Sequence, residues 1–202
     1  MDTESVLQSI GYFGVFLCVF IECGVPLGLI LPLPGYSMLF AAGVFASSGH
    51  MDLTTVIMIG LAAAILGYVV GYFTGYKYGR KLFFEKKTKK YFTAEQGHKT
   101  EKFMDRFGYS TLIAGRFLPF VHNLAPILSG VARTPVLYFM IANIIGATIW
   151  VVSGVLLGFY IGQSVPNSEF YVIPFVILLM IFVNMPYGRR SFKKFLAKID
   201  TI

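Results

Sequence analysis

The chain has 202 residues, of which 56% are hydrophobic and only 13% are charged. This composition excludes a soluble globule, which needs more polar residues to cover its surface, and it predicts one all-α integral membrane domain over residues 1–202. The formal net charge of +7 comes mainly from two basic segments, residues 77–106 and 189–202. By the positive-inside rule, the loop 77–106 and the C-terminal tail are both expected on the cytoplasmic side of a multi-pass protein.

The first apolar stretch, residues 6–49, contains one carboxylate, Glu22, followed by the helix breakers Pro26, Pro32 and Pro34. Broken backbone at membrane depth must be covered by protein or water, because hydrocarbon cannot satisfy its N–H and C=O groups. We therefore predict a re-entrant helical loop here. The uncharged run Leu53–Tyr76 then predicts a full span that ends at the first basic segment.

The apolar stretch 107–132 must begin and end on the cytoplasmic side. The run Pro135–Gly162 has to rise from the cytoplasm, and residues 170–188 have to return to the basic tail. The stretch 107–132 is therefore predicted to be a second re-entrant loop, with Pro119 and Pro126 at its turn.

The two halves match at an offset of 87 residues. The matched pairs are Gly28 with Gly115, Pro32 with Pro119, Gly43 with Gly130, Gly67 with Gly154, Gly71 with Gly158, and Gly75 with Gly162. This pattern predicts an inverted repeat, residues 10–79 and 107–162, joined by a basic linker or helix over 80–106. The expected fold has two opposed re-entrant loops, whose tips meet near the midplane, and about three full transmembrane helices.

Two charged residues lie in apolar sequence beside these breaks, Glu22 and Arg116. A charge in the bilayer core costs on the order of 3 kcal/mol on insertion scales, so such residues pair or line a watery cavity. We expect them to form a polar site between the two loops. The residues expected to shape the loop tips are Pro26, Pro32, Pro34, Gly35, Pro119, Pro126 and Gly130.

The chemistry of this site suits a lipid phosphate. Arg116 offers a planar, always charged donor, and His122 a second donor that titrates near neutral pH. Glu22 is expected to hold Arg116 when the site is empty, or to carry a proton. Neutral hydrogen bonds are expected from Tyr36, Tyr72 and Asn123.

The segment Gly115-Arg116-Phe117-Leu118-Pro119, continuing to Ser129-Gly130, resembles the signature of the DedA or VTT-domain membrane protein family. Two further segments are similar to that family: Leu66-Gly67, Tyr72, Gly75 and Gly79-Arg80 in a span, and Glu22, Gly24, Pro26, Pro34 and Gly35 in the first loop. The resemblance covers roughly residues 10 to 165.

This resemblance implies translocation of undecaprenyl phosphate or a phospholipid such as phosphatidylethanolamine between leaflets of the bacterial cytoplasmic membrane. Dependence on the proton gradient is implied as well. The chain departs from the family pattern at Tyr36, where an acidic residue is common, at His122, where a second arginine is common, and at Tyr68, where an aspartate is common.

Three other interpretations stay open. Glu22 and Arg116 could be a permanent ion pair that only fastens the loops. The protein could be a membrane scaffold without transport. Ser48-Gly49-His50 with Arg116 and His122 is similar to fragments of lipid phosphate phosphatases, but the topology separates these segments, so we expect no enzyme.

We expect no cofactor and no metal, because Cys18 and Cys23 have no ligand spacing around them. The expected partners are membrane lipids and protons, with no nucleic acid, since the lysines from Lys86 to Lys90 fit topology and anionic headgroups. The identity of the lipid, the direction of transport and the oligomeric state, a homo-oligomer included, stay open.

Overall fold

The structure is a computed structural model that describes residues 3–24, 35–84, 112–113, 115–117, 121–165, 167, 170–172, 174 and 178. These residues form helices and turns, with no strand in the described part of the chain. The helices are α1 (Thr3–Gly24), α2 (Gly35–Ser47), α3 (Leu53–Phe84), the short 3-10 helix η2 (Gly115–Phe117), α6 (Val121–Val131) and α7 (Val136–Ser164). The all-α prediction is confirmed for the described residues.

Two of these helices are long and apolar enough to cross a membrane, Leu53–Tyr78 within α3 and Val136–Ser164, which is α7. They coincide with the two spans predicted from the uncharged runs. Asp52 begins α3 as an N-cap, because the backbone N–H of Thr55 donates to Asp52 Oδ1 at 2.7 Å. Hydrogen bonds from Thr55 lower the pKa of this exposed carboxyl. The predicted final span, 170–188, and the basic tail lie almost wholly outside the described residues.

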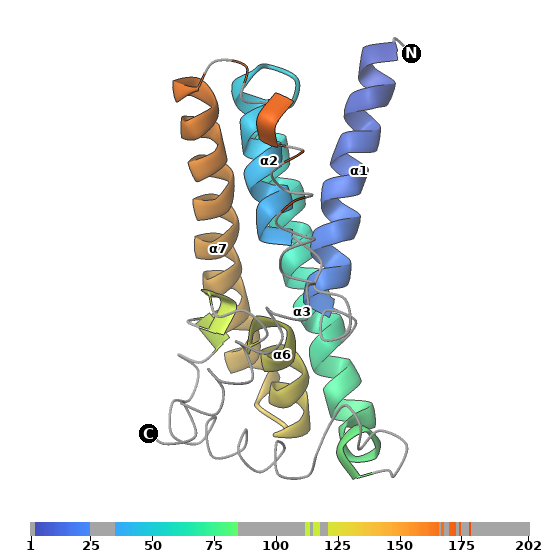
Figure 1. Cartoon of the computed structure of the whole chain (residues 1–202). Coiled ribbons are helices and arrows are strands. Elements are labelled where there is room, and N and C mark those ends of the chain that lie inside the picture. Colours follow the sequence, from blue (N-terminus) through green and yellow to red (C-terminus); the bar gives the residue numbers. More distant parts are fainter. Residues whose placement is uncertain are drawn as a thin grey trace.

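Two short apolar helices, α2 and α6, pack on the two long ones. Helix α2 packs mainly on α7, α6 mainly on α3, and α1 on α3. Figure 1 shows that α2 and α6 both begin in the middle part of the bundle and end at its opposite ends. The buried core lies among α1, α3 and α7, around residues such as Val19, Ala64 and Val151.

Close contact between these helices depends on glycines, which have no side chain. A Cβ at Gly75 would collide with the carbonyl oxygen of Ile127, and one at Gly130 with that of Tyr72. The backbones of α3 and α6 therefore touch. Small residues at such positions allow membrane helices to approach closely.

The expected loop-tip residues divide into three groups. Pro26, Pro32, Pro34 and Pro119 lie outside the described residues. Gly35 is the first residue of α2. Pro126 and Gly130 differ from expectation, because both lie within helix α6 and not at a turn.

Gly75→Ala should lower the thermal stability of the protein in detergent. The added methyl group meets backbone atoms of α6, which cannot rotate away, and overpacking of this kind costs about 1–3 kcal/mol. Gly14→Ala in α1 is the matched control. A Cβ there makes an ordinary contact of 3.9 Å with Met38 Cε, so the melting temperature should hold or rise. Equal melting temperatures for Gly75→Ala and the wild type would contradict the close packing of α3 on α6.

Candidate functional site

Six polar or charged side chains are buried in the described part of the chain: Glu22, Arg116, His122, Asn123, Ser129 and Asn143. The Ser129 hydroxyl bonds to the carbonyl oxygen of Ala125 within its own helix. Glu22, Arg116, His122 and Asn143 join through Tyr68 into one network between α1, α3, η2, α6 and α7. Because burial of polar groups is costly unless they are paired, this network is the main polar feature of the described core.

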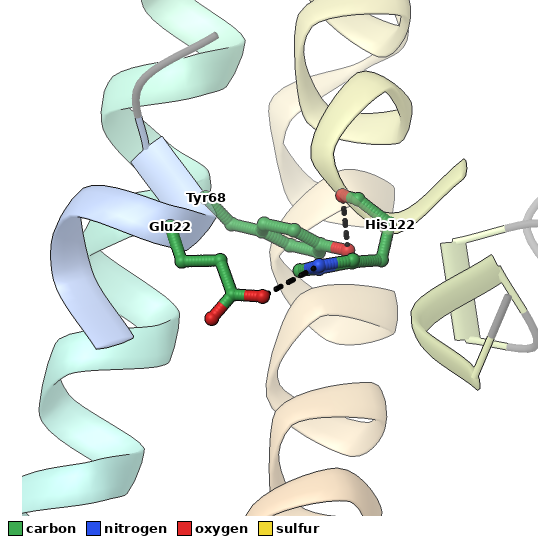
Figure 2. A network of polar contacts seen from close by, with 3 residues as sticks. All are labelled: Glu22, Tyr68 and His122. Carbon is green, nitrogen blue, oxygen red and sulfur yellow. Dashed lines mark hydrogen bonds and ion pairs between the residues drawn. The ribbon is translucent and has the colours of Figure 1, made fainter. Parts of the chain in front are cut away.

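Glu22, near the end of α1, contacts His122, the second residue of α6. Glu22 Oε1 lies 3.2 Å from His122 Nε2, and each residue is 7% exposed. Figure 2 shows the carboxylate pointing at the imidazole ring, with the Tyr68 ring beside them. The carboxylate and the imidazole are therefore within hydrogen-bond distance of each other.

The other carboxylate oxygen of Glu22 faces the beginning of α2. A Cβ at Gly35 would overlap Glu22 Oε2, so a larger residue at this position would displace the carboxylate. Glu22 Oε2 has no hydrogen-bond partner among the described residues. The carboxylate therefore lies between the N-terminal ends of two short helices, where the helix dipoles favour negative charge.

Arg116 has a neutral partner. Its Nη2 donates to the side-chain oxygen Oδ1 of Asn143 in α7, with the backbone oxygen of the same residue at 3.5 Å. Its Cζ lies 3.6 Å from the centroid of the Tyr68 ring, a cation–π contact. The guanidinium Nε has no hydrogen-bond partner among the described residues, and Arg116 is 3% exposed.

Tyr68 contacts both His122 and Arg116, and its hydroxyl also satisfies a free backbone carbonyl of α6. In a helix the carbonyl of His122 would accept the N–H of residue 126, but Pro126 has no N–H to give. The Tyr68 hydroxyl donates to this carbonyl oxygen instead, at 2.8 Å (Figure 2). A side-chain donor of this kind lets proline stay inside a membrane helix.

The remaining predicted site residues lie at different distances from this network. Tyr36 packs on Trp150, which in turn stacks on His122 at 6.0 Å between ring centroids. Asn123 is buried, and its Oδ1 has no hydrogen-bond partner among the described residues. The Tyr72 hydroxyl is committed elsewhere, since it donates to the carbonyl oxygen of Thr134 at 2.6 Å.

The expected contact between Glu22 and Arg116 is replaced by two separate pairs. The carboxylate bonds to His122, and the guanidinium bonds to Asn143. The reason is helix geometry, because α6 begins next to the end of α1 and brings His122 to Glu22, whereas η2 faces α7. Sequence reasoning missed Asn143, although an amide in the apolar span Val136–Ser164 is a recognisable signal.

No group of three or more His, Cys, Asp or Glu side chains that could hold a metal ion occurs within the described residues. The site offers one fixed cation, one titratable pair and unpartnered polar atoms on Glu22, Arg116 and Asn123. This inventory suits an anion and a proton.

Comparison with known proteins shows the family of the chain. The family model of the VTT domain matches residues 33–160. The protein DedA of Escherichia coli (strain K12) is 36% identical over 154 residues, which cover 75% of this chain and 68% of the relative. The chain belongs to the DedA family of VTT-domain membrane proteins.

Other relatives of this VTT-domain protein carry names that refer to membranes. The inner membrane protein YghB of Escherichia coli (strain K12) is 33% identical over 183 residues, which cover 87% of this chain and 80% of the relative. An uncharacterized membrane protein of Mycobacterium tuberculosis is 31% identical over 190 residues, covering 92% and 80%. No solved structure matches the chain. Together with the two long apolar helices, these relatives identify the chain as a membrane protein.

Two residues of this VTT-domain protein that the sequence resemblance marks as unusual, Tyr68 and His122, are in direct contact. The Tyr68 hydroxyl donates to the backbone carbonyl oxygen of His122.

Tyr68→Phe should lower thermal stability by about 1–3 kcal/mol, because the carbonyl oxygen of His122 loses its donor. Tyr68→Leu should cost more, since the ring face under Arg116 is lost as well. Tyr160→Phe, at a position that is 61% exposed, is the control and should change little. Thermal unfolding of the three variants in detergent would check this. If Tyr68→Phe melts with the wild type, the hydroxyl does not replace the missing N–H of Pro126.

Proposed function

We propose that this chain is a lipid translocase that moves a phosphate-bearing lipid between the leaflets of the bilayer. The observation that carries the proposal is a buried guanidinium whose described side-chain acceptor is a neutral amide. The lipid is undecaprenyl phosphate or a glycerophospholipid such as phosphatidylethanolamine. The protein acts as a transporter and not as an enzyme, in the bacterial cytoplasmic membrane.

The charge of Arg116 supports this proposal. Taking an ion out of water costs several kcal/mol, and a hydrogen bond to an amide offsets only part of that cost. A phosphate bound at Arg116 would supply a negative charge that no described residue pairs with this guanidinium, through hydrogen bonds about twice as strong as neutral ones. The acyl or prenyl chain of the lipid would remain in the surrounding hydrocarbon while the headgroup passes the cation.

The pair of Glu22 and His122 supports proton coupling. The two groups that can exchange a proton face each other at 3.2 Å in a buried place, and Glu22 is the carboxylate that the described helices bury. In the proposed cycle, the pair changes its charge as it gains or loses a proton. The change alters the electric field at Arg116 and thus the hold on the phosphate.

The finer fold proposal is an inverted repeat with two opposed re-entrant loops. The offset of 87 residues maps α2 onto α6 and α3 onto α7. The short helix of each half packs on the long helix of the other half, because α2 packs on α7 and α6 packs on α3. Both short helices begin in the middle of the bundle and end at opposite ends (Figure 1). In secondary transporters, such half-length helices meet at the substrate site. On this proposal the basic segments face the cytoplasm.

The two alternatives make different predictions. A scaffold protein would show no lipid exchange when purified and reconstituted into vesicles. A phosphatase would release phosphate from lipid phosphates, which the translocase does not do. Reconstituted exchange of undecaprenyl phosphate, phosphatidylethanolamine and phosphatidylglycerol, with phosphate release measured in the same samples, would distinguish all three.

Arg116→Lys should slow lipid exchange on the order of tenfold or more, although the charge is kept. A lysine ammonium cannot reproduce the planar fork of the guanidinium or its stacking on Tyr68. Arg133→Lys, at an exposed turn residue, is the matched control and should exchange at the wild-type rate. Exchange rates in vesicles check this, with folding verified by thermal unfolding. A folded Arg116→Lys protein with the wild-type rate would contradict a bidentate phosphate site.

Glu22→Gln should flatten the dependence of exchange on the proton gradient, since glutamine cannot exchange a proton with His122. Asp52→Asn is the control, because it also removes a carboxylate but leaves a good N-cap at an exposed position. Exchange would be measured in vesicles with and without an imposed pH difference. If Glu22→Gln responds to the gradient as the wild type does, Glu22 is not the coupling group.

A further inference from the structure

Asn143 is a buried amide whose two side-chain hydrogen bonds go to other elements of the fold. It is fully buried in α7, with 0% of its surface exposed. Its Nδ2 donates to the carbonyl oxygen of Ile65 in α3 at 3.2 Å, and its Oδ1 accepts from Arg116. Both of its hydrogen bonds lead to other elements, so the amide ties α7 to α3 and to η2.

These two partners leave the amide only one orientation. The carbonyl of Ile65 can only accept a hydrogen bond, and the guanidinium of Arg116 can only donate one. The Nδ2 group must therefore face Ile65, and Oδ1 must face Arg116. The side chain is held as a neutral acceptor aimed at the cation.

Packing contacts hold the rest of the Arg116 side chain, and its Nε has no hydrogen-bond partner among the described residues. The Tyr68 ring lies under the guanidinium, and Gly146 leaves room for the stem, since a Cβ there would lie 3.1 Å from Arg116 Cδ and Nε. If another acceptor replaced Asn143 Oδ1, these packing contacts would still hold the guanidinium in place. The amide is therefore the one described side-chain acceptor at this cation that can be exchanged.

We propose that Asn143 is a positioning residue that sets the affinity of Arg116 for lipid phosphate, as a resting acceptor that a phosphate oxygen displaces. The inference rests on the proposed function. A charged phosphate oxygen competes well against a neutral amide oxygen, because it adds attraction between opposite charges and can bind the guanidinium in a bidentate way. A carboxylate at the same place would form a salt bridge with Arg116 and compete with the phosphate for it. The neutrality of residue 143 thus keeps the cation available.

The test is binding of dihexanoyl phosphatidic acid to the purified protein in dodecyl maltoside, which brings no competing phosphate. Asn143→Asp should raise the dissociation constant on the order of tenfold or more at about pH 8, where a carboxyl beside an arginine is ionised. Asn143→Ser, whose neutral acceptor is shorter and competes less for the guanidinium, should bind more tightly than the wild type. Ser164→Asp places the same added charge at the exposed end of α7 and should not change the dissociation constant.

A purely structural role for Asn143 predicts a different pattern. Both substitutions at 143 would then lower the melting temperature, and the dissociation constant of the folded fraction would stay at the wild-type value. That result would overturn the inference. If Asn143→Asp does not fold, the Asn143→Ser protein decides, because unchanged or weaker binding there would mean that the amide does not compete with the anion.

The same assay separates this inference from the proposed function. Arg116→Gln should abolish binding of the lipid phosphate if the proposed function is right. Loss of binding in Arg116→Gln together with wild-type binding in Asn143→Asp would reject the role of Asn143 alone. Wild-type binding in Arg116→Gln would reject the phosphate site itself.

Discussion

The cost of keeping a charge inside a membrane domain governs the arrangement of this protein. Arg116 stays charged at any physiological pH, so it cannot escape the cost of burial by losing its proton. Its surroundings consist of a neutral amide, an aromatic ring and a glycine that leaves room for the methylene groups of its side chain. These contacts locate the cation without neutralising it. A buried cation that pairs with no carboxylate among the described residues is an unusual choice for a purely structural element, for which an apolar residue is often the more stable solution.

The broken helices around this cation follow the same logic. Every polar backbone group freed by a break must find a partner within the protein, because lipid offers none. The hydroxyl of Tyr68 shows how this is done, since it bonds to the carbonyl that Pro126 leaves free. The same side chain lies under the guanidinium. Tyr68 therefore both satisfies the backbone of α6 and packs against Arg116. A change in the position of α6 would affect Arg116 through this side chain.

Much of this arrangement could be predicted from the sequence. Uncharged runs located α3 and α7, and charges in apolar sequence singled out Glu22 and Arg116. The pairing of these residues could not be predicted, because Glu22 and His122 are 100 residues apart and meet only when α6 packs beside α1. Pro126 was expected at a turn since proline ordinarily ends helices, whereas a donor from α3 replaces its missing N–H. The role of Asn143 likewise depends on which face of α7 meets η2, a feature of packing and not of composition.

The central claim is that a lipid phosphate binds at the guanidinium of Arg116, and a distance measurement tests it most directly. Solid-state NMR can measure dipolar coupling between the phosphorus of a bound phospholipid and the guanidinium carbon of labelled arginine, with the Arg116→Lys protein identifying the signal. Phosphorus is expected in direct contact with Arg116, with nitrogen–oxygen separations of about 2.8 Å, as in charge-assisted hydrogen bonds. An Arg116 signal that shows no coupling to phosphorus while the protein exchanges lipid would contradict the account.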